Sequence, residues 1–482
     1  MEKGGQLKII SEDQIVDTYL ASQNILQNVG VTIPEQIVLK ELKAAGCLVQ
    51  NTRVRIPPHI IEEAVRSAPG RFTLYGRRPN YKVELEGRRV CFQPMIGRLN
   101  TLDSKTKGKR RTNLEDVAKM VKVCDALPHY HLLHSGAIMP HIEGIPDEIA
   151  HVLGYYTSVK NSSKVIKGTC RGGQKAIDCL SMASIVAGSE EELKKNPGIY
   201  TTYNVISPLE HGREMLEGLR EYVAYGQPVD ITAEPQMGAT SPVTLAGTLI
   251  QQTAELLSGV VITQVLRQGT PVFIGTCGAA LDMRHGTISL GGIEAALLNT
   301  AHAQIAQYLQ IPSRGTGSNT ESKILDFQAG YEKAITLLLP ALAGINMIFY
   351  PGTLDHAETI SIESLVMDHD VCSMVVRALQ GISFTEKTTA LEIIAKVGPG
   401  GHYLKERHTI DFMQSELLTP KIADRRRRED WETAGGKDMA QAAEQEVEKI
   451  LSEHQVLPLE AKADEELLRV IEKTKKRLSS AG

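Results

Sequence analysis

A repeated alternation of β-rich runs and helical patterns constrains this chain more than any other feature. Between residues 90 and 350, eight short runs favour strands, and a longer apolar periodicity typical of a helix separates each run from the next. The β-rich runs are Val90–Gln93, His131–Ser135, Lys164–Gly168, Tyr200–Ser207, Val229–Glu234, Val272–Thr276, Pro312–Gly315 and Asn346–Tyr350. The helical patterns are Asn113–Leu127, Glu148–Lys160, Gln174–Val186, His211–Tyr225, Thr244–Gln268, Gly292–Leu309 and Glu321–Leu339.

The spacing of these runs predicts the fold. Each repeat spans roughly 28 to 42 residues, which is what a strand and its crossover helix need. A doubly wound sheet could also give this alternation, but eight successive units fit a closed barrel better. No GxGxxG follows the first strand, which removes the main sign of a dinucleotide fold. We therefore expect an α/β protein: a (β/α)8 TIM barrel with helical N- and C-terminal extensions.

The flanking segments divide the chain into three parts. Residues 1–88 are expected to form an N-terminal helical extension with a hairpin of Phe72–Tyr75 and Tyr81–Leu85. Residues 89–380 are assigned to the barrel. Residues 381–482 form a C-terminal helical extension, interrupted by Gly398-Pro399-Gly400-Gly401 and closed by two charged helices.

Charge and cysteine content exclude several classes of protein. The formal net charge of −4 is small for 482 residues, so neither nucleic acid nor an anionic membrane is an expected partner. The seven cysteines are odd in number and form no CxxC pair, which argues against a secreted disulfide framework. Neither a signal peptide nor a membrane span is apparent. A cytoplasmic location is expected.

Candidate ligand-binding residues stand where the predicted strands end, since barrel enzymes place their sites at the carboxyl ends of the strands. Aromatic residues make up only 5% of the chain, yet Phe273 and Phe349 join three other aromatics on these strands. Aromatic faces can hold a quaternary ammonium, although ordinary core packing is the alternative explanation. The candidate substrate-binding residues are Phe92, Gln93, Tyr203, Asn204, Glu234, Arg314 and Tyr350.

Small residues form a second group at the strand ends. Glycine permits close approach of a flat ligand or a protein backbone, although the loops that follow strands also use glycine for tight turns. This second group comprises Gly168, Thr169, Gly275, Thr276, Gly315, Thr316, Gly317 and Ser318.

Two further residues suggest chemistry. His356 follows the eighth strand on a loop expected to overhang the barrel mouth, where it could contact an anion or move a proton, or simply face solvent. Lys167 lies near the end of the third strand and could be a Schiff-base lysine, although strand alternation leaves its direction undecided.

The ligand-type clusters do not have the spacing of a known metal site. They are His129, His131 and His134, and the run Asp368-His369-Asp370. Neither has a recognised zinc spacing, so no metal is expected.

Three runs carry a resemblance that extends over nearly the whole chain. They are Ser241-Pro242-Val243-Thr244-Leu245-Ala246-Gly247, Asp326-Phe327-Gln328-Ala329-Gly330-Tyr331-Glu332-Lys333 and Val397-Gly398-Pro399-Gly400-Gly401-His402-Tyr403. In them the sequence resembles the trimethylamine methyltransferase superfamily. The founding branch of that family uses pyrrolysine, which this sequence lacks, so the chain resembles the non-pyrrolysine branch, whose members act on quaternary amines.

The resemblance implies a barrel enzyme that demethylates glycine betaine or a similar betaine. The methyl group passes to the Co(I) of a separate corrinoid protein, so no tightly bound cofactor is expected in this chain. His356 is then the candidate catalytic residue, and the small residues at the strand ends are candidates for facing the corrinoid. A homo-oligomer is possible. A Schiff-base lyase or aldolase, and a non-catalytic paralogue that binds betaine or the corrinoid protein, are the alternatives.

Overall fold

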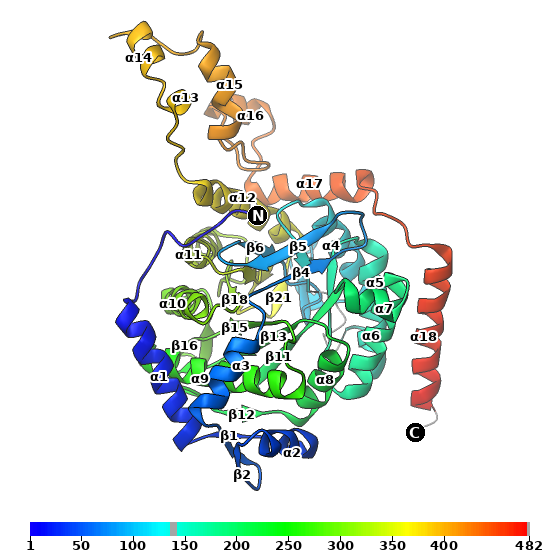
Figure 1. The fold of residues 1–482 in the computed structure, drawn as a ribbon. Coiled ribbons are helices and arrows are strands. Elements are labelled where there is room, and N and C mark those ends of the chain that lie inside the picture. Colours follow the sequence, from blue (N-terminus) through cyan, green and yellow to red (C-terminus); the bar gives the residue numbers. More distant parts are fainter. Residues whose placement is uncertain (135–141, 480–482) are drawn as a thin grey trace.

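The computed structural model describes residues 1–134 and 142–479 of the chain (Figure 1). Eight parallel strands form the core of its 12-stranded central sheet and fall on the eight predicted β-rich runs, although Ser135 of the second run lies outside the described residues. The strands are β6 (Cys91–Gln93), β9 (Leu132–Leu133), β10 (Val165–Gly168), β11 (Ile199–Ile206), β13 (Val229–Ala233), β15 (Val272–Thr276), β18 (Ser313–Thr316) and β19 (Met347–Phe349). The α/β class expected from the sequence is confirmed.

The pairing of these strands is parallel throughout. From β9 to β19 each strand pairs with the next in chain order, and β19 pairs with β6. Parallel bridges join Phe92 to Tyr130 and Met95 to His134. These bridges place the segment that contains β9 next to β6, so the strand order leads back to β6.

Helices lie around the central sheet and match the predicted helical patterns to within a few residues at most ends (Figure 1). Their bounds are α4 (Leu114–Ala126), α5 (Asp147–Asn161), α6 (Gly173–Ala187), α7 (Glu190–Lys195), α8 (Arg213–Ala224), α9 (Leu245–Leu266), α10 (Ile293–Leu309), α11 (Phe327–Ala343) and α12 (Ile362–Gln380). Local sequence sets their ends: Asn113 and Asp116 form a capping box at the start of α4, and Gly344 in a left-handed conformation ends α11. The short helix α7 was not predicted.

One helix of the described chain is apolar and long enough to cross a bilayer, judged by length and composition alone. This is α9, and 72% of its most apolar window is buried inside the structure. It packs against α1 (Glu12–Asn28) and α3 (Pro58–Ser67) on one side and against β13 on the other. A helix covered on both sides is apolar all round because it belongs to the core.

The N-terminal extension covers one side and one end of the central sheet. Its first part comprises α1, β1 (Val31–Thr32), α2 (Gln36–Ala44), β2 (Leu48–Gln50), β3 (Arg53–Arg55) and α3, and β1 joins the sheet through β12 (Glu210–His211). The predicted hairpin follows as β4 (Arg71–Tyr75) and β5 (Lys82–Glu86). Its apolar residues Leu74, Val83 and Leu85 are buried against the first inward-facing residues of the central strands. The hairpin therefore closes the amino-terminal end of the sheet.

At the carboxyl ends of the strands, small sheets that the sequence did not predict are built from the connecting loops. One combines β14 (Gln236–Met237), β16 (Ala279–Asp282) and β17 (Thr287–Ser289). The other combines β7 (Asn100–Leu102), β8 (Lys109–Arg111), β20 (Thr353–Leu354) and β21 (Thr359–Ile360). Both lie on the side where barrel enzymes carry their sites.

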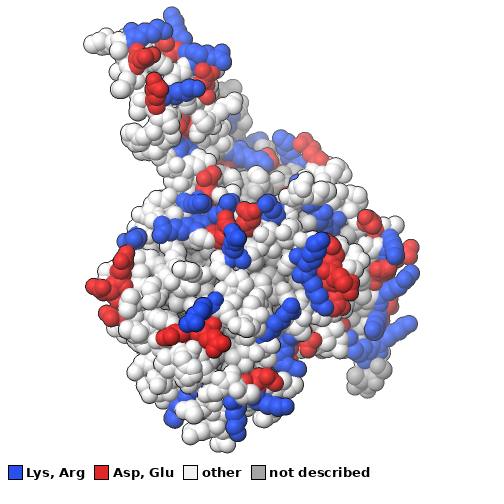
Figure 2. Space-filling view, in the orientation of Figure 1, with Lys and Arg blue, Asp and Glu red and all other residues white. Residues whose placement is uncertain are grey.

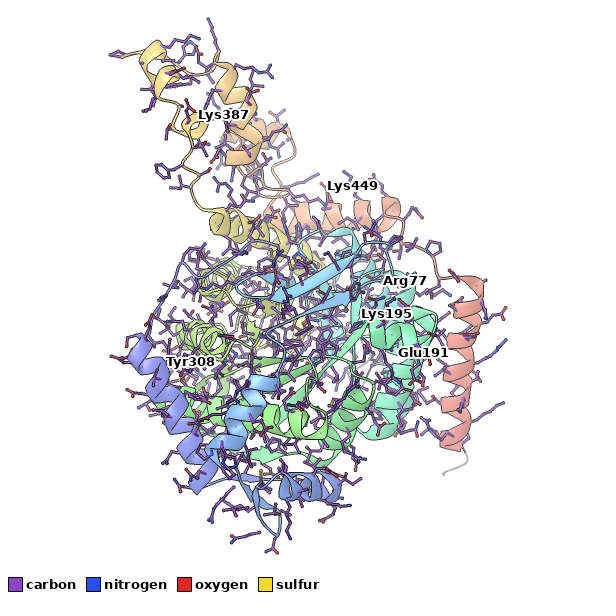
Figure 3. The ribbon with its side chains drawn as sticks, viewed as in Figure 1. Arg77, Glu191, Lys195, Tyr308, Lys387 and Lys449 are labelled. Carbon is purple, nitrogen blue, oxygen red and sulfur yellow. The ribbon has the colours of Figure 1, made fainter. Side chains whose placement is uncertain are left out.

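The last hundred residues divide into a projecting part and a returning part (Figures 1 and 3). The projecting part carries α13 (Glu386–Thr389), α14 (Leu391–Val397), α15 (Arg407–Glu416) and α16 (Arg428–Thr433), and the returning part carries α17 (Met439–Glu453) and α18 (Ala461–Ser479). A hydrogen bond and an ion pair fix the returning part: His454 bonds to Asp125 at 2.8 Å, and Arg477 pairs with Asp178 through a contact of 3.0 Å.

Candidate active site

A buried arginine lies at the centre of the candidate site. Arg314 on β18 donates through Nη1 to Thr232 Oγ1 at 3.2 Å and to Cys277 Sγ at 3.1 Å. Its side chain is 3% exposed. Gly275 on the neighbouring strand leaves room for the Arg314 side chain, because a Cβ at position 275 would lie only 2.8 Å from Arg314 Cδ. A larger residue at position 275 would therefore clash with Arg314.

Asp230 partly balances the charge of Arg314. Its Oδ2 lies 3.6 Å from Arg314 Nε and accepts a hydrogen bond of 2.8 Å from Thr202. Thr232 donates to its other carboxylate oxygen at 2.9 Å. Burial opposes the charge of Arg314, but Cys277 and Asp230 outweigh that cost and raise its pKa. The guanidinium is therefore a permanent buried cation.

A second cationic group, Lys167 on β10, faces the same interior. Burial lowers the pKa of Lys167 to about 7, because desolvation and the charge of Arg314 outweigh the opposing effect of Asp230. Its Nζ lies 5.8 Å from the ring centre of Phe349. Near neutral pH the interior thus holds one full and one partial positive charge beside the buried carboxylate of Asp230.

Three ring side chains, Phe349, His134 and Tyr350, lie beside these charged groups. The Phe349 ring has Arg314 Cζ at 4.5 Å from its centre, and the ring centres of His134 and Tyr350 lie at 4.9 and 4.4 Å. Burial and the nearby charges of Lys167 and Arg98 hold the pKa of His134 well below its usual range, so this ring is neutral. One face of Phe349 is therefore taken by the protein's own cation.

Four predicted substrate-binding residues lie at this site besides Arg314. Tyr350 donates to Cys277 Sγ at 3.8 Å, and Glu234 is an exposed carboxylate that acts on the charges of Arg314 and Lys167. The Oδ1 atom of Asn204 is buried without a hydrogen-bond donor among the described residues. Gln93 donates its amide to the Tyr200 hydroxyl one layer deeper.

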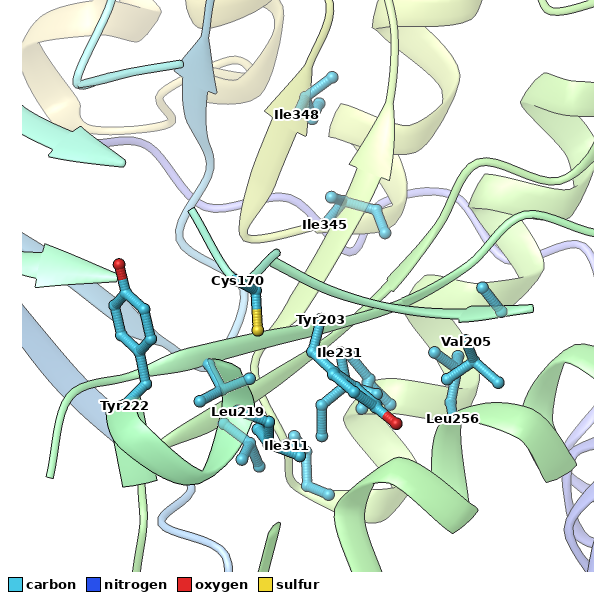
Figure 4. Packing of buried hydrophobic residues seen from close by; sticks show 14 of the residues in the cluster. Cys170, Tyr203, Val205, Leu219, Tyr222, Ile231, Leu256, Ile311, Ile345 and Ile348 are labelled. Atoms are coloured by element: carbon cyan, nitrogen blue, oxygen red, sulfur yellow. The ribbon is translucent and has the colours of Figure 1, made fainter. Parts of the chain in front are cut away.

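Two of the predicted aromatic residues face the helices instead, so the expectation that they line the cavity is wrong. Tyr203 shares a hydrogen bond of 2.5 Å with His211 Nδ1 and packs in the outer core with Ile231 and Leu256 (Figure 4). Phe92 belongs to the same outer cluster. Successive strand residues face opposite sides, so an error of one residue in the register reverses the direction of each ring.

The predicted small-residue group is also mostly turned toward the helices. A Cβ at Gly168 would meet the Tyr222 hydroxyl, at Gly315 it would meet Asn299, and at Gly317 it would meet Ile348 and the backbone of α11. These three glycines allow close packing of helices on the sheet, so the expectation that they face a corrinoid is wrong.

The remaining members of this group lie at the strand ends in varied settings. Thr276 donates to Gln252 of α9 at 2.5 Å, and Thr316 accepts from Asn299 of α10 at 3.1 Å. The hydroxyl of Thr169 accepts from the Arg171 amide at 3.3 Å. Ser318 is buried in a left-handed conformation with φ of 59°. None of these contacts leads to Arg314.

His356 lies at the edge of the site and contacts a neighbouring loop. Its Nδ1 donates to the carbonyl of Ile288 on β17 at 2.9 Å, and Glu321 Oε1 lies 3.9 Å from the same nitrogen. Asp355, His356 and Ala357 all have positive φ near 55° to 60°. This turn brings Ala357 into contact with the cluster around Phe349 and Tyr350.

The histidine clusters have structural partners. His129 stacks on His369 with ring centres 4.9 Å apart, and His131 Nδ1 accepts from the Phe92 amide at 3.2 Å. Within residues 1–134 and 142–479, no group of three His, Cys, Asp or Glu side chains could hold a metal ion.

Sequence reasoning missed Asp230, and it considered His134 only as part of a ligand-type cluster and Lys167 only as a possible Schiff-base residue. A usable signal was present in β13, where Asp230 and Thr232 alternate with Val229, Ile231 and Ala233. Polar residues on one face of an otherwise buried strand indicate an interior that contains charge. That face includes the partners of Arg314.

Comparison with known proteins places the chain in a family. The pattern described as trimethylamine methyltransferase (MTTB) matches residues 1–479, so the chain belongs to the trimethylamine methyltransferase family. The chain is 34% identical over 426 residues to a glycine betaine methyltransferase of Desulfitobacterium hafniense (strain Y51), covering 88% of each chain. It is 32% identical to the trimethylamine methyltransferase MttB of D. hafniense (strain DSM 10664 / DCB-2), over 98% of this chain and 95% of the relative.

A solved structure also resembles the chain. The crystal structure of the hydroxylamine MtmB complex matches with a TM-score of 0.50 and 14% identity, over 93% of this chain and 95% of the other. This likeness shows a shared fold. The resemblance found in the sequence is confirmed, and the match to a glycine betaine methyltransferase agrees with the expected non-pyrrolysine branch.

Proposed function

We propose that this methyltransferase demethylates a betaine, passing one methyl group from the quaternary nitrogen to the Co(I) of a separate corrinoid protein. We interpret the returning ring of strands as a (β/α)8 barrel with its mouth at the carboxyl ends. The observation that carries the proposal is Arg314, a buried guanidinium held beside Phe349 and Tyr350.

The charge of the site favours a substrate with a carboxylate. Arg314 and Lys167 outweigh the buried carboxylate of Asp230, so the inner part of the site suits an anion, while the exposed Glu234 carboxylate at its edge suits a cation. A betaine presents an anion to the guanidinium and its ammonium to the Tyr350 ring and the Glu234 carboxylate. Family membership and the glycine betaine methyltransferase relative support the same substrate class.

The residues of this chain would act mainly by positioning. The corrinoid supplies the nucleophile that accepts the methyl group, so the protein has to hold the ammonium in line with it and exclude water. Arg314 fixes the carboxylate end, and the buried Asn204 Oδ1 places a partial negative charge where an ammonium group can approach it. Positive charge on nitrogen disappears as the methyl leaves, so Glu234 must anchor the substrate without holding the ammonium too tightly.

A substrate panel tests this proposal. Glycine betaine, longer betaines and trimethylamine are offered with a reduced corrinoid protein, and methylation of cobalt is followed by absorbance. We expect methylation with a carboxylate-bearing betaine and none with trimethylamine. Turnover of trimethylamine alone, or betaine demethylation with tetrahydrofolate and no corrinoid, would contradict the proposal. Binding without any methyl transfer would identify a non-catalytic paralogue.

One observation favours a second candidate, a Schiff-base enzyme. Lys167 is buried and its pKa is lowered to about 7, which is what a nucleophilic amine requires. Trapping with borohydride and a panel of aldehydes tests it, because a covalent adduct on Lys167 would support that chemistry. Family membership supports methyl transfer instead.

We infer a cytoplasmic location. All seven cysteines are buried as free thiols, which suits a reducing compartment.

A further inference from the structure

A second arginine, Arg98, lies beside the candidate site. It stands on the loop between β6 and β7, and two backbone hydrogen bonds of 3.0 Å fix that loop. In one, Met95 donates to the carbonyl of Pro351, and in the other Ile96 donates to the carbonyl of His134. The loop is thus held at the carboxyl ends of β9 and β19, where the rings of the candidate site lie.

The charge of Arg98 acts on the same rings as the charge of Arg314. Burial lowers the pKa of His134, and the charges of both arginines lower it further. Burial raises the pKa of Tyr350, and the same two charges oppose that rise. The two guanidinium groups therefore lie near one another's part of the site, although they come from opposite ends of the strand order.

Arg98 lacks a counter-ion. Its side chain is partly buried, its Nε is buried without a hydrogen-bond partner, and no ion pair joins it to any of residues 1–134 and 142–479. Residues 135–141 contain no Asp or Glu. Figure 2 shows a different arrangement on one face of the molecule, where Lys and Arg side chains are interspersed with Asp and Glu. Burying a charge without a partner is unfavourable, so the folded protein gains when an anion reaches this guanidinium.

A carboxylate can satisfy both arginines at once. Its two oxygens have room for several hydrogen bonds, so each oxygen can accept from a different guanidinium. Arg314 donates through Nη1 to Thr232 and Cys277, and its Nε is buried without a hydrogen-bond partner among the described residues. Arg314 already has Asp230 beside it. An incoming anion therefore gains more from Arg98, whose charge is not balanced.

We infer that Arg98 binds the substrate carboxylate together with Arg314 and selects substrates that carry this group. The inference rests on the proposed function, because it takes a betaine as the ligand. A betaine and choline present the same trimethylammonium group to the aromatic ring, but only the betaine gives Arg98 a counter-ion. Arg98 is thus the residue that distinguishes the two.

Calorimetric titration of the full-length protein tests the inference, with glycine betaine, longer betaines and choline as the probes. Arg98→Met should weaken binding of the preferred betaine at least about tenfold and leave choline binding unchanged. Arg98→Lys keeps the charge but not the two-pronged geometry, so it should recover part of the affinity. The control is Arg111→Met, which removes an exposed arginine of β8 beside the same loop and should bind betaine like the wild type.

Thermal melting separates a binding role from a structural one. Because Arg98 has no partner in the described protein, Arg98→Met should melt at the wild-type temperature or above it. A lowered melting temperature would show a structural role and overturn the inference. Wild-type betaine affinity in Arg98→Met, or an equal loss for betaine and choline, would overturn it as well. Unchanged betaine affinity with a raised KM for the corrinoid protein would assign Arg98 to the methyl acceptor instead.

These outcomes also distinguish the inference from the proposed function. Betaine binding that depends on Arg98, without any methyl transfer, would contradict the proposed reaction and support the inference. Methyl transfer from a betaine that does not depend on Arg98 would do the reverse. A wild-type protein that binds no betaine would overturn both.

Discussion

The two ends of the central sheet are built from the same strands but from opposite chemistry. At the amino-terminal end, Cys91, Val165, Phe273 and Met347 face inward and are covered by the β4–β5 hairpin. Two residues further along the same strands stand Gln93, Lys167, Gly275 and Phe349, with Arg314 among them. Apolar burial stabilises the first end, whereas buried charge costs stability at the second. This difference supports our proposal that the charged end is the binding site.

Replacing Arg314 should have the largest effect. Arg314→Met leaves Asp230 as an unpaired buried charge, so unfolding free energy should fall by about 3–5 kcal/mol. Methyl transfer from a betaine should fall at least about a hundredfold in kcat/KM, or roughly 2.7 kcal/mol. Urea unfolding and steady-state kinetics measure the two effects. Adding Asp230→Asn should restore most of the stability but none of the activity; recovery of both would mean that Arg314 is only structural.

At the amino-terminal end the expected effect is on stability alone. Phe273→Ala removes a buried ring that contacts Phe72 and Tyr200, and should cost about 3–5 kcal/mol of unfolding free energy. Phe273→Leu is the control and should cost less than about 1.5 kcal/mol. The KM for a betaine should not change in either folded variant. A raised KM in Phe273→Leu would show that the two ends are coupled.

Two tyrosines allow a core position to be compared with a position at the candidate site. Tyr203→Leu removes the partner of His211 and should lower the unfolding free energy by about 1–3 kcal/mol without changing substrate affinity. Tyr350→Leu should weaken betaine binding by about 0.5–2 kcal/mol, while Tyr350→Phe keeps the ring and changes affinity little. Calorimetric titration and thermal melts report both. The reverse pattern would place the substrate on the helix-facing side.

Substitution of His356 tests the role of the loop at the edge of the charged end. If its ring acts on the substrate carboxylate or the departing amine, His356→Ala should reduce methyl transfer about tenfold, or roughly 1.4 kcal/mol. His356→Gln, which can still donate to the Ile288 carbonyl, is the control for the loop contact. Wild-type rates in the alanine variant would leave His356 with a structural role only.

The smallest expected effect is the pH dependence of binding. The Lys167 ammonium is lost as pH rises through its pKa of about 7, so betaine affinity should fall roughly fivefold, about 1 kcal/mol, between pH 6 and pH 8. Unfolding free energy should rise with pH above 7, because the unfolded chain still binds this proton up to its ordinary pKa of about 10.4. Lys167→Met should remove both slopes. A slope that persists in this variant would belong to another group.

The strands could be predicted from the sequence because each is a short buried apolar run between clear helical patterns. The sequence did not show which way individual side chains face. Tyr203 and Asn204 are adjacent, and only the register shows that the tyrosine faces α9 while the amide faces inward. The ion pair of Arg314 and Asp230 joins residues far apart in sequence, so spacing along the chain could not reveal it. The loop sheets formed by β7, β8, β20 and β21 also depend on distant pairing.

The ion pair between Arg477 and Asp178 sets an order of events in biosynthesis. Asp178 lies on α6, while Arg477 lies on α18, 299 residues further along the chain. During translation α6 emerges long before its partner exists, since chains fold from the N-terminus as they are made. The face of α6 that α18 covers therefore stays exposed until α18 has left the ribosome. A chain that terminates before α18 would leave this face exposed permanently.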